Sequence, residues 1–79
     1  MTDEEALGMV RDAINEVSAG AGDKVTMETD LVADEVLDSL DIMNFLFELE
    51  TANGSKIEAI DETYDDYRVS SIVEHLKNQ

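Results

Sequence analysis

The tripeptide Asp38-Ser39-Leu40 places a hydroxyl beside a carboxylate where a helix is expected to begin. Asp38 is a favourable N-cap residue, and Asp41 adds a second carboxylate in the first turn. A helix N-terminus offers unpaired N–H groups and a positive dipole end, which both stabilise a phosphate. The Ser39 hydroxyl is therefore a favourable place for a phosphodiester, and Asp38 could hold the divalent metal of a modifying enzyme. On position alone, an ordinary first-turn serine is the simpler interpretation.

The helix expected over residues 39–52 carries more apolar surface than a single packed face requires. At about 100° per residue, Asp41, Asn44 and Glu48 share one narrow polar face. The apolar residues spread over an arc of about 240°, whereas a surface helix needs little more than 100°. These apolar residues are Leu40, Ile42, Met43, Phe45, Leu46, Phe47 and Leu49.

Two interpretations of this wide apolar arc are open, and both can hold together. The helix could simply be the most buried element of a small bundle. Alternatively, one edge formed by Leu40, Met43 and Phe47 stays exposed beside the acidic face. An exposed apolar strip with acids at its rim would be a docking surface for a basic, apolar groove.

The N-terminal segment is expected to form a helix that runs to about Ser18. Thr2 and Glu5 have the spacing of a capping box at its start. Apolar residues follow at steps of three and four, at Leu7, Val10, Ile14 and Val17. Gly20 is the expected C-terminal cap residue.

A long loop and two further helices complete the expected fold. Residues 20–37 lack a regular apolar spacing, so a long connection is expected, and such long loops are often functional. The apolar residues expected to pin it to the core are Val25, Met27, Leu31, Val32 and Leu37. Gly54 or Asn53 should end the middle helix, and Asp61 could cap a short helical turn near residues 62–67. A last amphipathic helix contains Val69, Ile72, Val73 and Leu76. The prediction is an all-α, up-down bundle of three main helices and one short helix, in a single domain of residues 1–79.

Length and charge exclude several classes of function. The chain has 79 residues, which corresponds to one small domain and leaves no room for a cleft between two domains. Its 20 acidic and 5 basic residues give a formal net charge of −15, which repels nucleic acids and anionic membranes. Proteins with basic patches are the expected partners, with an attraction that depends on salt.

The residue types that several kinds of active site need are missing. The chain has no cysteine, which excludes disulfides, thiolate catalysis and zinc-thiolate sites. The single histidine, His75, is expected to be a surface or boundary residue and leaves no Ser-His-Asp set. The acid pairs lack the spacing of an EF-hand, so no specific metal site is expected. The acidic N-terminus does not resemble a signal peptide and no apolar stretch approaches about 20 residues, so a cytoplasmic location is expected.

Around Ser39 the chain resembles the acyl and peptidyl carrier proteins. In that family a D-S-L motif opens the second helix, as Asp38-Ser39-Leu40 does here, and residues 41–50 are similar to the helix that follows. The chain length, the acidity, the absence of cysteine, the long first loop and the apolar last helix agree with the resemblance. Together with the Asp30-Leu31 pair, they extend it over about residues 4–77.

The resemblance implies a carrier that is not itself an enzyme. Ser39 would receive 4′-phosphopantetheine from coenzyme A through a phosphopantetheinyl transferase. The thiol of this arm would then carry an acyl or aminoacyl group as a thioester. Asp38 and Asp41 would lie beside the transferase and its metal. The residues that would dock partner enzymes with basic patches are Leu40, Asp41, Met43, Phe47 and Glu48.

Other positions bear on the kind of carrier. Ile57 matches the apolar residue that lines the core or the acyl pocket in the family. Val36, Asn44, Asn53 and Arg68 differ from the residues that are common there, which favours a specialised carrier over the fatty-acid one. Fatty-acid, polyketide and non-ribosomal-peptide-type biosynthesis all remain open as pathways, and a monomer is expected.

A second function from a different class is also compatible with the composition. A small acidic helical protein could be an adaptor or inhibitor that masks a basic surface on a partner protein. Such a protein needs surface charge but no modified serine, so the role of Ser39 distinguishes the two hypotheses.

Overall fold

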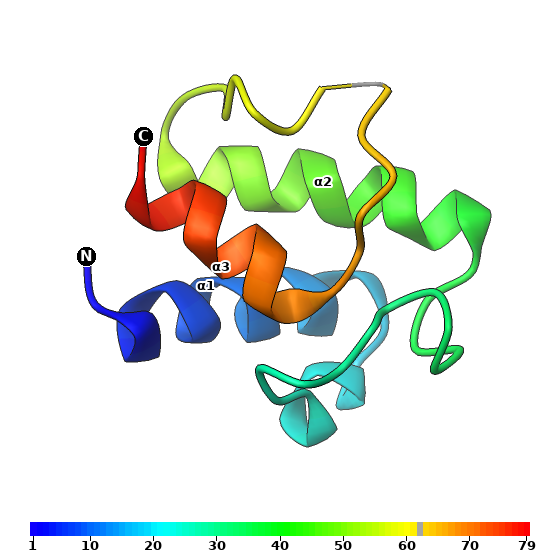
Figure 1. The fold of residues 1–79 in the computed structure, drawn as a ribbon. Coiled ribbons are helices and arrows are strands. Elements are labelled where there is room, and N and C mark those ends of the chain that lie inside the picture. Colours follow the sequence, from blue (N-terminus) through cyan, green and yellow to red (C-terminus); the bar gives the residue numbers. More distant parts are fainter. Residues whose placement is uncertain (62) are drawn as a thin grey trace.

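The computed structural model describes residues 1–61 and 63–79. Its elements are α1 (Asp3–Val17), the 3₁₀ helix η1 (Ala21–Lys24), α2 (Ser39–Asn53) and α3 (Val69–Lys77). Figure 1 shows these helices and the long loop between η1 and α2. Within the described ranges the only β-pairing is an isolated antiparallel bridge between Asp30 and Arg68. The prediction of a small all-α bundle with three main helices and one short helix is confirmed.

The helix boundaries follow from the capping residues that the sequence indicated. Thr2 Oγ1 accepts from the Glu5 N–H at 3.2 Å, and Glu5 Oε1 accepts from the Thr2 N–H at 3.1 Å, which completes the capping box. These hydrogen bonds lower the pKa of the Glu5 carboxyl. Asp38 Oδ1 accepts from the Asp41 N–H at 2.8 Å and caps α2. Gly54, with φ +82°, ends α2 in the left-handed conformation that glycine allows.

The short helix lies elsewhere than predicted. Residues 63–67 form no helix, and residue 62 of the predicted turn lies outside the described residues. The Asp61 carboxylate instead accepts from the backbone N–H and the hydroxyl of Thr63, at 2.9 and 2.6 Å. Local hydrogen bonds of this kind compete with helix formation.

The short helix is η1. It forms there because residues 20–24 pack against the C-terminal half of α1. Asn15 Oδ1 accepts from the Gly22 N–H at 2.8 Å, and Gly22 packs directly on the Arg11 carbonyl. Ser18, not Gly20, is the C-cap of α1, and Gly20 precedes η1 with φ +84°. A tertiary contact with α1 therefore determines where the short helix forms.

α1 is the one main helix that contacts both of the others. It packs against both α2 and α3, whereas no Cα atoms of α2 and α3 lie within 8 Å of each other. α2 runs back along α1, and both chain termini lie at the same end of the bundle (Figure 1). There Lys77 Nζ lies 2.7 Å from Asp3 Oδ1. Residues 55–61 and 63–68, here called the strap, return along α2 to the start of α3.

The core draws on all three main helices, the first loop and the strap. The buried apolar residues are Ala6, Val10, Ala13, Ile14, Val25, Leu31, Leu37, Ile42, Phe45, Leu49, Ile57, Ile60, Val69, Ile72, Val73 and Leu76. Three of the first-loop residues expected to pin that loop do so, since Val25, Leu31 and Leu37 are buried. Val32 does not, and its side chain is 51% exposed.

The first loop and the strap are joined beside the start of α3. Leu31 N of the first loop donates to Tyr67 O of the strap (2.9 Å), and at the start of α3 Val69 N donates to Thr29 O (2.8 Å) and Ser70 N to Met27 O (3.2 Å) of the first loop. The N-cap residue of α3, Arg68, makes no side-chain capping bond. Carbonyl groups of the first loop therefore accept hydrogen bonds from N–H groups at the start of α3, a role that a capping side chain usually fills.

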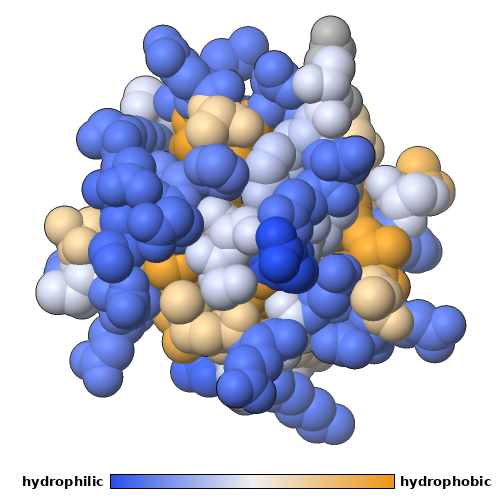
Figure 2. All heavy atoms as spheres, in the orientation of Figure 1, coloured by the Kyte–Doolittle hydropathy of each residue, from blue (hydrophilic) through white to orange (hydrophobic). Residues whose placement is uncertain are grey.

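Hydrophilic residues cover most of the face shown in Figure 2, and apolar patches lie between them. Each of the helices in the described ranges is too short or too polar to cross a membrane.

Candidate functional site

Ser39 is the first residue of α2 and is exposed. Its neighbour Asp38 is also exposed and caps the helix through the Asp41 N–H. The hydroxyl therefore lies at the positive end of a 15-residue helix, beside N–H groups without intrahelical partners. A phosphate attached at this oxygen would be stabilised by those groups, and nothing in the described residues encloses it.

A cavity of about 580 Å³ opens beside Ser39 and is here called the Ser39 cavity. Its volume lies within the range of small-molecule sites, about 300–1,000 Å³. Its polar lining residues are Glu35, Asp38 and Ser39. The remaining lining residues are apolar or aromatic: Val32, Leu37, Ile42, Met43 and Tyr67.

α2 buries one face and leaves an apolar edge exposed, as the second interpretation of its wide apolar arc expected, but it is not the most buried helix, because α1 and α3 each bury more residues. Ile42, Phe45 and Leu49 are buried in the core. Leu40, Met43 and Phe47, here called the α2 strip, are 77%, 60% and 67% exposed. Large apolar side chains this exposed on one helix edge are typical of an interaction surface.

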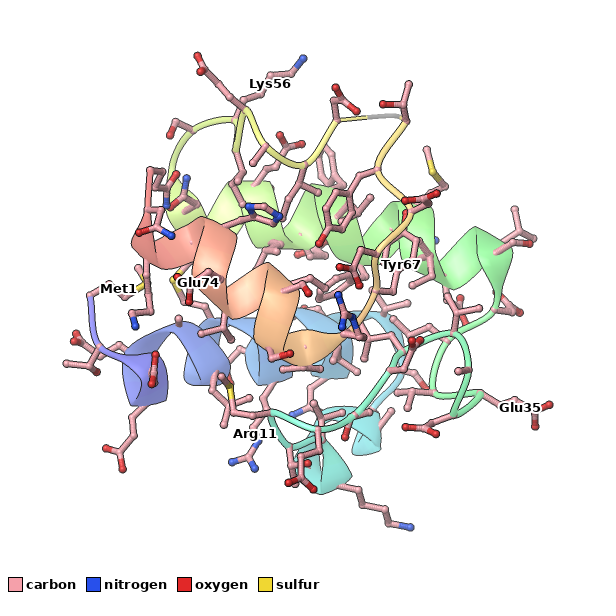
Figure 3. All side chains as sticks on the ribbon, in the orientation of Figure 1. Met1, Arg11, Glu35, Lys56, Tyr67 and Glu74 are labelled. Carbon is pink, nitrogen blue, oxygen red and sulfur yellow. The ribbon has the colours of Figure 1, made fainter. Side chains whose placement is uncertain are left out.

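Acidic residues flank the α2 strip. Asp41 and Glu48 are partly exposed on α2, and Asp38 is exposed at its start. Glu35 extends away from the bundle near the same end of α2 (Figure 3). Glu35 has φ +56°, a left-handed conformation that side-chain-bearing residues rarely adopt. The strip therefore has the acidic rim that the sequence predicted.

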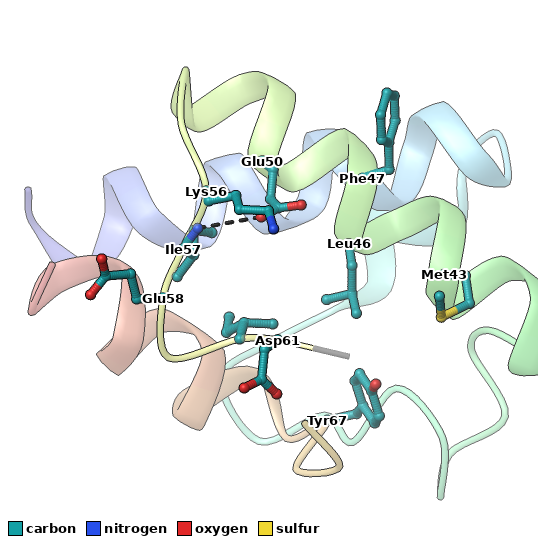
Figure 4. Close-up of a pocket in the computed structure, with 10 residues that line it drawn as sticks. Met43, Leu46, Phe47, Glu50, Lys56, Ile57, Glu58, Asp61 and Tyr67 are labelled. Carbon is teal, nitrogen blue, oxygen red and sulfur yellow. Dashed lines mark hydrogen bonds between the residues drawn. The ribbon is translucent and has the colours of Figure 1, made fainter. Parts of the chain in front are cut away.

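A second cavity of about 700 Å³ lies between α2 and the strap and is here called the strap cavity (Figure 4). Its lining residues are Met43, Leu46, Phe47, Glu50, Lys56, Ile57, Glu58, Ile60, Asp61 and Tyr67. Glu50 Oε2 accepts from the Ile57 N–H at 3.4 Å, which attaches the strap to α2. Ile57 is buried and lines this cavity, at the position expected for it.

Tyr67 contributes to both cavities, although no sequence pattern indicated it as a site residue. Its hydroxyl donates to the Tyr64 carbonyl at 2.9 Å. The Tyr64 ring meets the Tyr67 ring and the His75 ring edge-on, at centroid distances of 5.6 and 5.5 Å. His75 is half-buried, consistent with the boundary position expected of it. Two tyrosines three residues apart were the only sequence signal for this cluster.

Burial in this aromatic cluster affects both phenols. It is the main cause that raises the pKa of Tyr64 to about 12, and the negative charge of Asp66 adds to it. Burial also raises the pKa of Tyr67. The Tyr64 hydroxyl oxygen is buried and has no hydrogen-bond partner among the described residues.

These shifts predict a loss of stability at alkaline pH. The folded state favours the protonated Tyr64, so its stabilisation is present below pH 10 and is lost as the pH rises towards 12. Tyr64→Phe should reduce this alkaline loss and should keep or raise the free energy of unfolding at pH 8 by up to about 1 kcal/mol. Urea unfolding of the wild-type protein and of Tyr64→Phe between pH 8 and 11 would measure how the free energy of unfolding of each depends on pH.

Tyr67→Phe is the matched control for this prediction. It removes a hydroxyl that does donate a hydrogen bond, so it should lower the free energy of unfolding at pH 8 by about 1 kcal/mol. Equal losses for Tyr64→Phe and Tyr67→Phe would contradict this account of Tyr64.

Among residues 1–61 and 63–79, no three His, Asp or Glu side chains form a group that could hold a metal ion. Neither a protein-family model, nor a curated protein, nor a solved structure matches this chain. The exposed Ser39, the α2 strip and the two cavities are therefore the features that indicate what the site can do.

Proposed function

We propose that the protein is a carrier of the acyl-carrier type and is not itself an enzyme. A phosphopantetheinyl transferase would attach 4′-phosphopantetheine from coenzyme A to Ser39. The serine oxygen forms a bond to the phosphorus that bears the pantetheine arm, the bond from that phosphorus to the nucleotide breaks, and the transferase takes the hydroxyl proton. The thiol of the arm then carries an acyl or aminoacyl group as a thioester between partner enzymes.

The observation that carries this proposal is the exposed Ser39 hydroxyl at the first residue of α2, within the Asp38-Ser39-Leu40 motif. The helix dipole and the free N–H groups favour the phosphodiester that the modification creates. Asp38 uses one carboxylate oxygen as the helix cap. The other oxygen can meet the metal that the transferase brings with its donor.

The partner enzymes in this proposal recognise the α2 strip together with Asp41 and Glu48. Exposed apolar side chains favour docking into an apolar groove, and the acids favour a basic rim around that groove. The net charge of −15 would steer such partners and disfavours nucleic acids and anionic membranes. We propose a monomeric, cytoplasmic protein that serves fatty-acid, polyketide or non-ribosomal-peptide-type biosynthesis.

Intact mass measurement tests the attachment site. Wild-type protein incubated with coenzyme A, magnesium and a broad-specificity transferase should gain one phosphopantetheinyl group, and Ser39→Ala should gain none. Ser70→Ala is the matched control, because Ser70 is also an exposed serine in the first turn of a helix, and this variant should load fully. An unloaded wild type, or a loaded Ser39→Ala, would refute the carrier.

The acidic surface also supports a second candidate, an adaptor or inhibitor that masks a basic surface. In that case Ser39→Ala should keep full partner binding, while Asp41→Lys combined with Glu48→Lys should weaken it. The mass measurement separates the two candidates, because only the carrier needs the Ser39 oxygen.

A further inference from the structure

The junction between α2 and the strap carries the dipeptide Asn53-Gly54, which the proposed function does not use. Among the asparagines of the chain, Asn53 is the one that glycine follows. Glycine has no Cβ, so its backbone nitrogen can approach the side-chain carboxamide of the preceding asparagine. Asn53 is partly exposed and Gly54 is exposed, so water reaches both residues. The dipeptide therefore has the residue types and the accessibility that deamidation needs.

Deamidation at this dipeptide needs water but no enzyme. The Gly54 nitrogen forms a bond to Cγ of Asn53, the bond from Cγ to Nδ2 breaks, and Nδ2 leaves as ammonia with the proton from the Gly54 nitrogen. Water then opens the cyclic imide at either carbonyl and gives aspartate or isoaspartate at position 53. Both products carry a carboxylate in place of the amide.

Hydrogen bonds at the end of α2 hold both reacting groups. The Gly54 N–H donates to the carbonyls of Glu50 at 3.0 Å and Thr51 at 3.2 Å, which opposes loss of its proton. The Asn53 carboxamide forms a reciprocal pair with Gln79. Asn53 Nδ2 donates to Gln79 Oε1 at 2.9 Å, and Gln79 Nε2 donates to Asn53 Oδ1 at 2.6 Å. Attack on Cγ therefore requires that the cap of α2 opens and that this amide pair separates.

The amide pair depends on the position of α3. Gln79 lies just beyond α3, and Figure 1 shows the end of α3 beside the end of α2. The other acceptors of Asn53 Nδ2 are the carbonyl oxygen and Oγ of Ser55, at 3.1 and 3.2 Å, and these local contacts do not involve α3. The contact with Gln79 is therefore the one that couples the Asn53 side chain to α3.

We propose that Asn53 is a deamidation site and that Gln79 controls the rate of its modification. While α3 is in place, the amide pair and the cap of α2 together preserve the asparagine. When the end of α3 moves away, the carboxamide is released and only the cap of α2 still opposes the reaction. This inference does not involve Ser39 and is independent of the proposed function.

The modification would weaken the end of α2 permanently. The new carboxylate lies at the negative end of the helix dipole, where a negative charge is unfavourable. Isoaspartate also adds a methylene group to the backbone within the cap that Gly54 forms. The strap begins at this point, and its bond from the Ile57 N–H to Glu50 lies on the same turn of α2. Deamidation therefore loosens the attachment of the strap to α2.

Mass measurement of proteolytic fragments tests the site. Wild-type protein is kept in warm, mildly alkaline buffer with and without urea, and the conversion of each amide to an acid is followed over time. In urea Asn53 should be converted, while Asn15, which precedes the bulkier Glu16, should keep its amide. In the folded protein Asn53 should react at least about tenfold more slowly than in urea, because attack must wait for local opening.

Substitution of Gln79 tests the control of the rate. Gln79→Ala should speed the conversion of Asn53 in the folded protein about fivefold, the factor that corresponds to one lost hydrogen bond. Asn78→Ala is the matched control, because the neighbouring amide of Asn78 bonds to Glu74 and not to Asn53, and this variant should react at the wild-type rate. Asn53→Asp mimics one product and should lower Tm by about 4 °C.

Each outcome bears on a distinct claim. Failure of Asn53 to react in urea would overturn the site itself. Equal rates with and without urea would show that the end of α2 gives no protection, and equal rates for the wild type and Gln79→Ala would overturn the role of Gln79. An unchanged Tm for Asn53→Asp would contradict the expected weakening of α2.

Discussion

Replacing Phe45 by alanine is expected to lower the free energy of unfolding by about 3–5 kcal/mol. Phe45 is completely buried and is the largest of the fully buried side chains in the described residues. Its loss removes apolar contacts and leaves a cavity in the face of α2 that packs into the core. A chain of 79 residues has a thin core and a total stability of about 5–15 kcal/mol at most. Urea unfolding followed by circular dichroism should show that Phe45→Ala retains only a small part of the wild-type free energy of unfolding.

Phe47→Ala is the matched control, since it makes the same change two residues further along α2. Phe47 is mostly exposed and points away from the strap in Figure 4, so its loss should change the free energy of unfolding by less than about 0.5 kcal/mol. In the proposed carrier it should instead raise the KM of the transferase for the protein several-fold. A large loss of stability at Phe47, or none at Phe45, would contradict the orientation of α2.

Gly22→Ala is expected to lower the free energy of unfolding by about 2–3 kcal/mol. A methyl group at this position would overlap the Arg11 carbonyl oxygen and lie 2.9 Å from Asn15 Oδ1. The carbonyl belongs to the backbone of α1 and cannot move aside as a side chain can. The overlap should also break the bond from the Gly22 N–H to Asn15 and release η1 from α1. A fall in Tm of about 10 °C or more in a thermal scan is the expected result.

Gly8→Ala should act in the opposite direction. Gly8 lies within α1, and a methyl group there meets no atom within 4 Å. Alanine loses less backbone entropy in a helix than glycine, so the free energy of unfolding should rise by about 0.5–1 kcal/mol. If both glycine variants lost stability alike, the close contact at Gly22 would not be the cause.

The three main helices and the exposed position of Ser39 could be predicted because local signals specify them. The Thr2-Glu5 capping box, the Asp38 cap and Gly54 each act through residues within one helical turn. The wide apolar arc of α2 indicated both a buried face and an exposed edge, and the structure shows both. Such signals need no knowledge of the tertiary contacts.

The remaining parts of the site depend on contacts between segments that are distant in the sequence. The spacing of residue types along the chain does not indicate such contacts. The position of η1 follows from the packing of Gly22 on α1, and the acidic run around Tyr64 and Tyr67 gave no sign that the strap covers α2. Val32 was expected in the core but lines the Ser39 cavity with half of its surface exposed. The sequence therefore predicted the helix that presents Ser39 but not the wall opposite it.

The backbone bonds between residues 27–31 and 67–70 have a mechanical consequence for the proposed carrier. Leu31 is bonded to Tyr67, so the stretch of chain that leads to Ser39 and the wall of the strap cavity are parts of one hydrogen-bonded unit. A partner that moves the strap therefore also pulls on the chain that leads to Ser39, the proposed attachment point. Movement of that wall and repositioning of a group attached at Ser39 would then be one event rather than two.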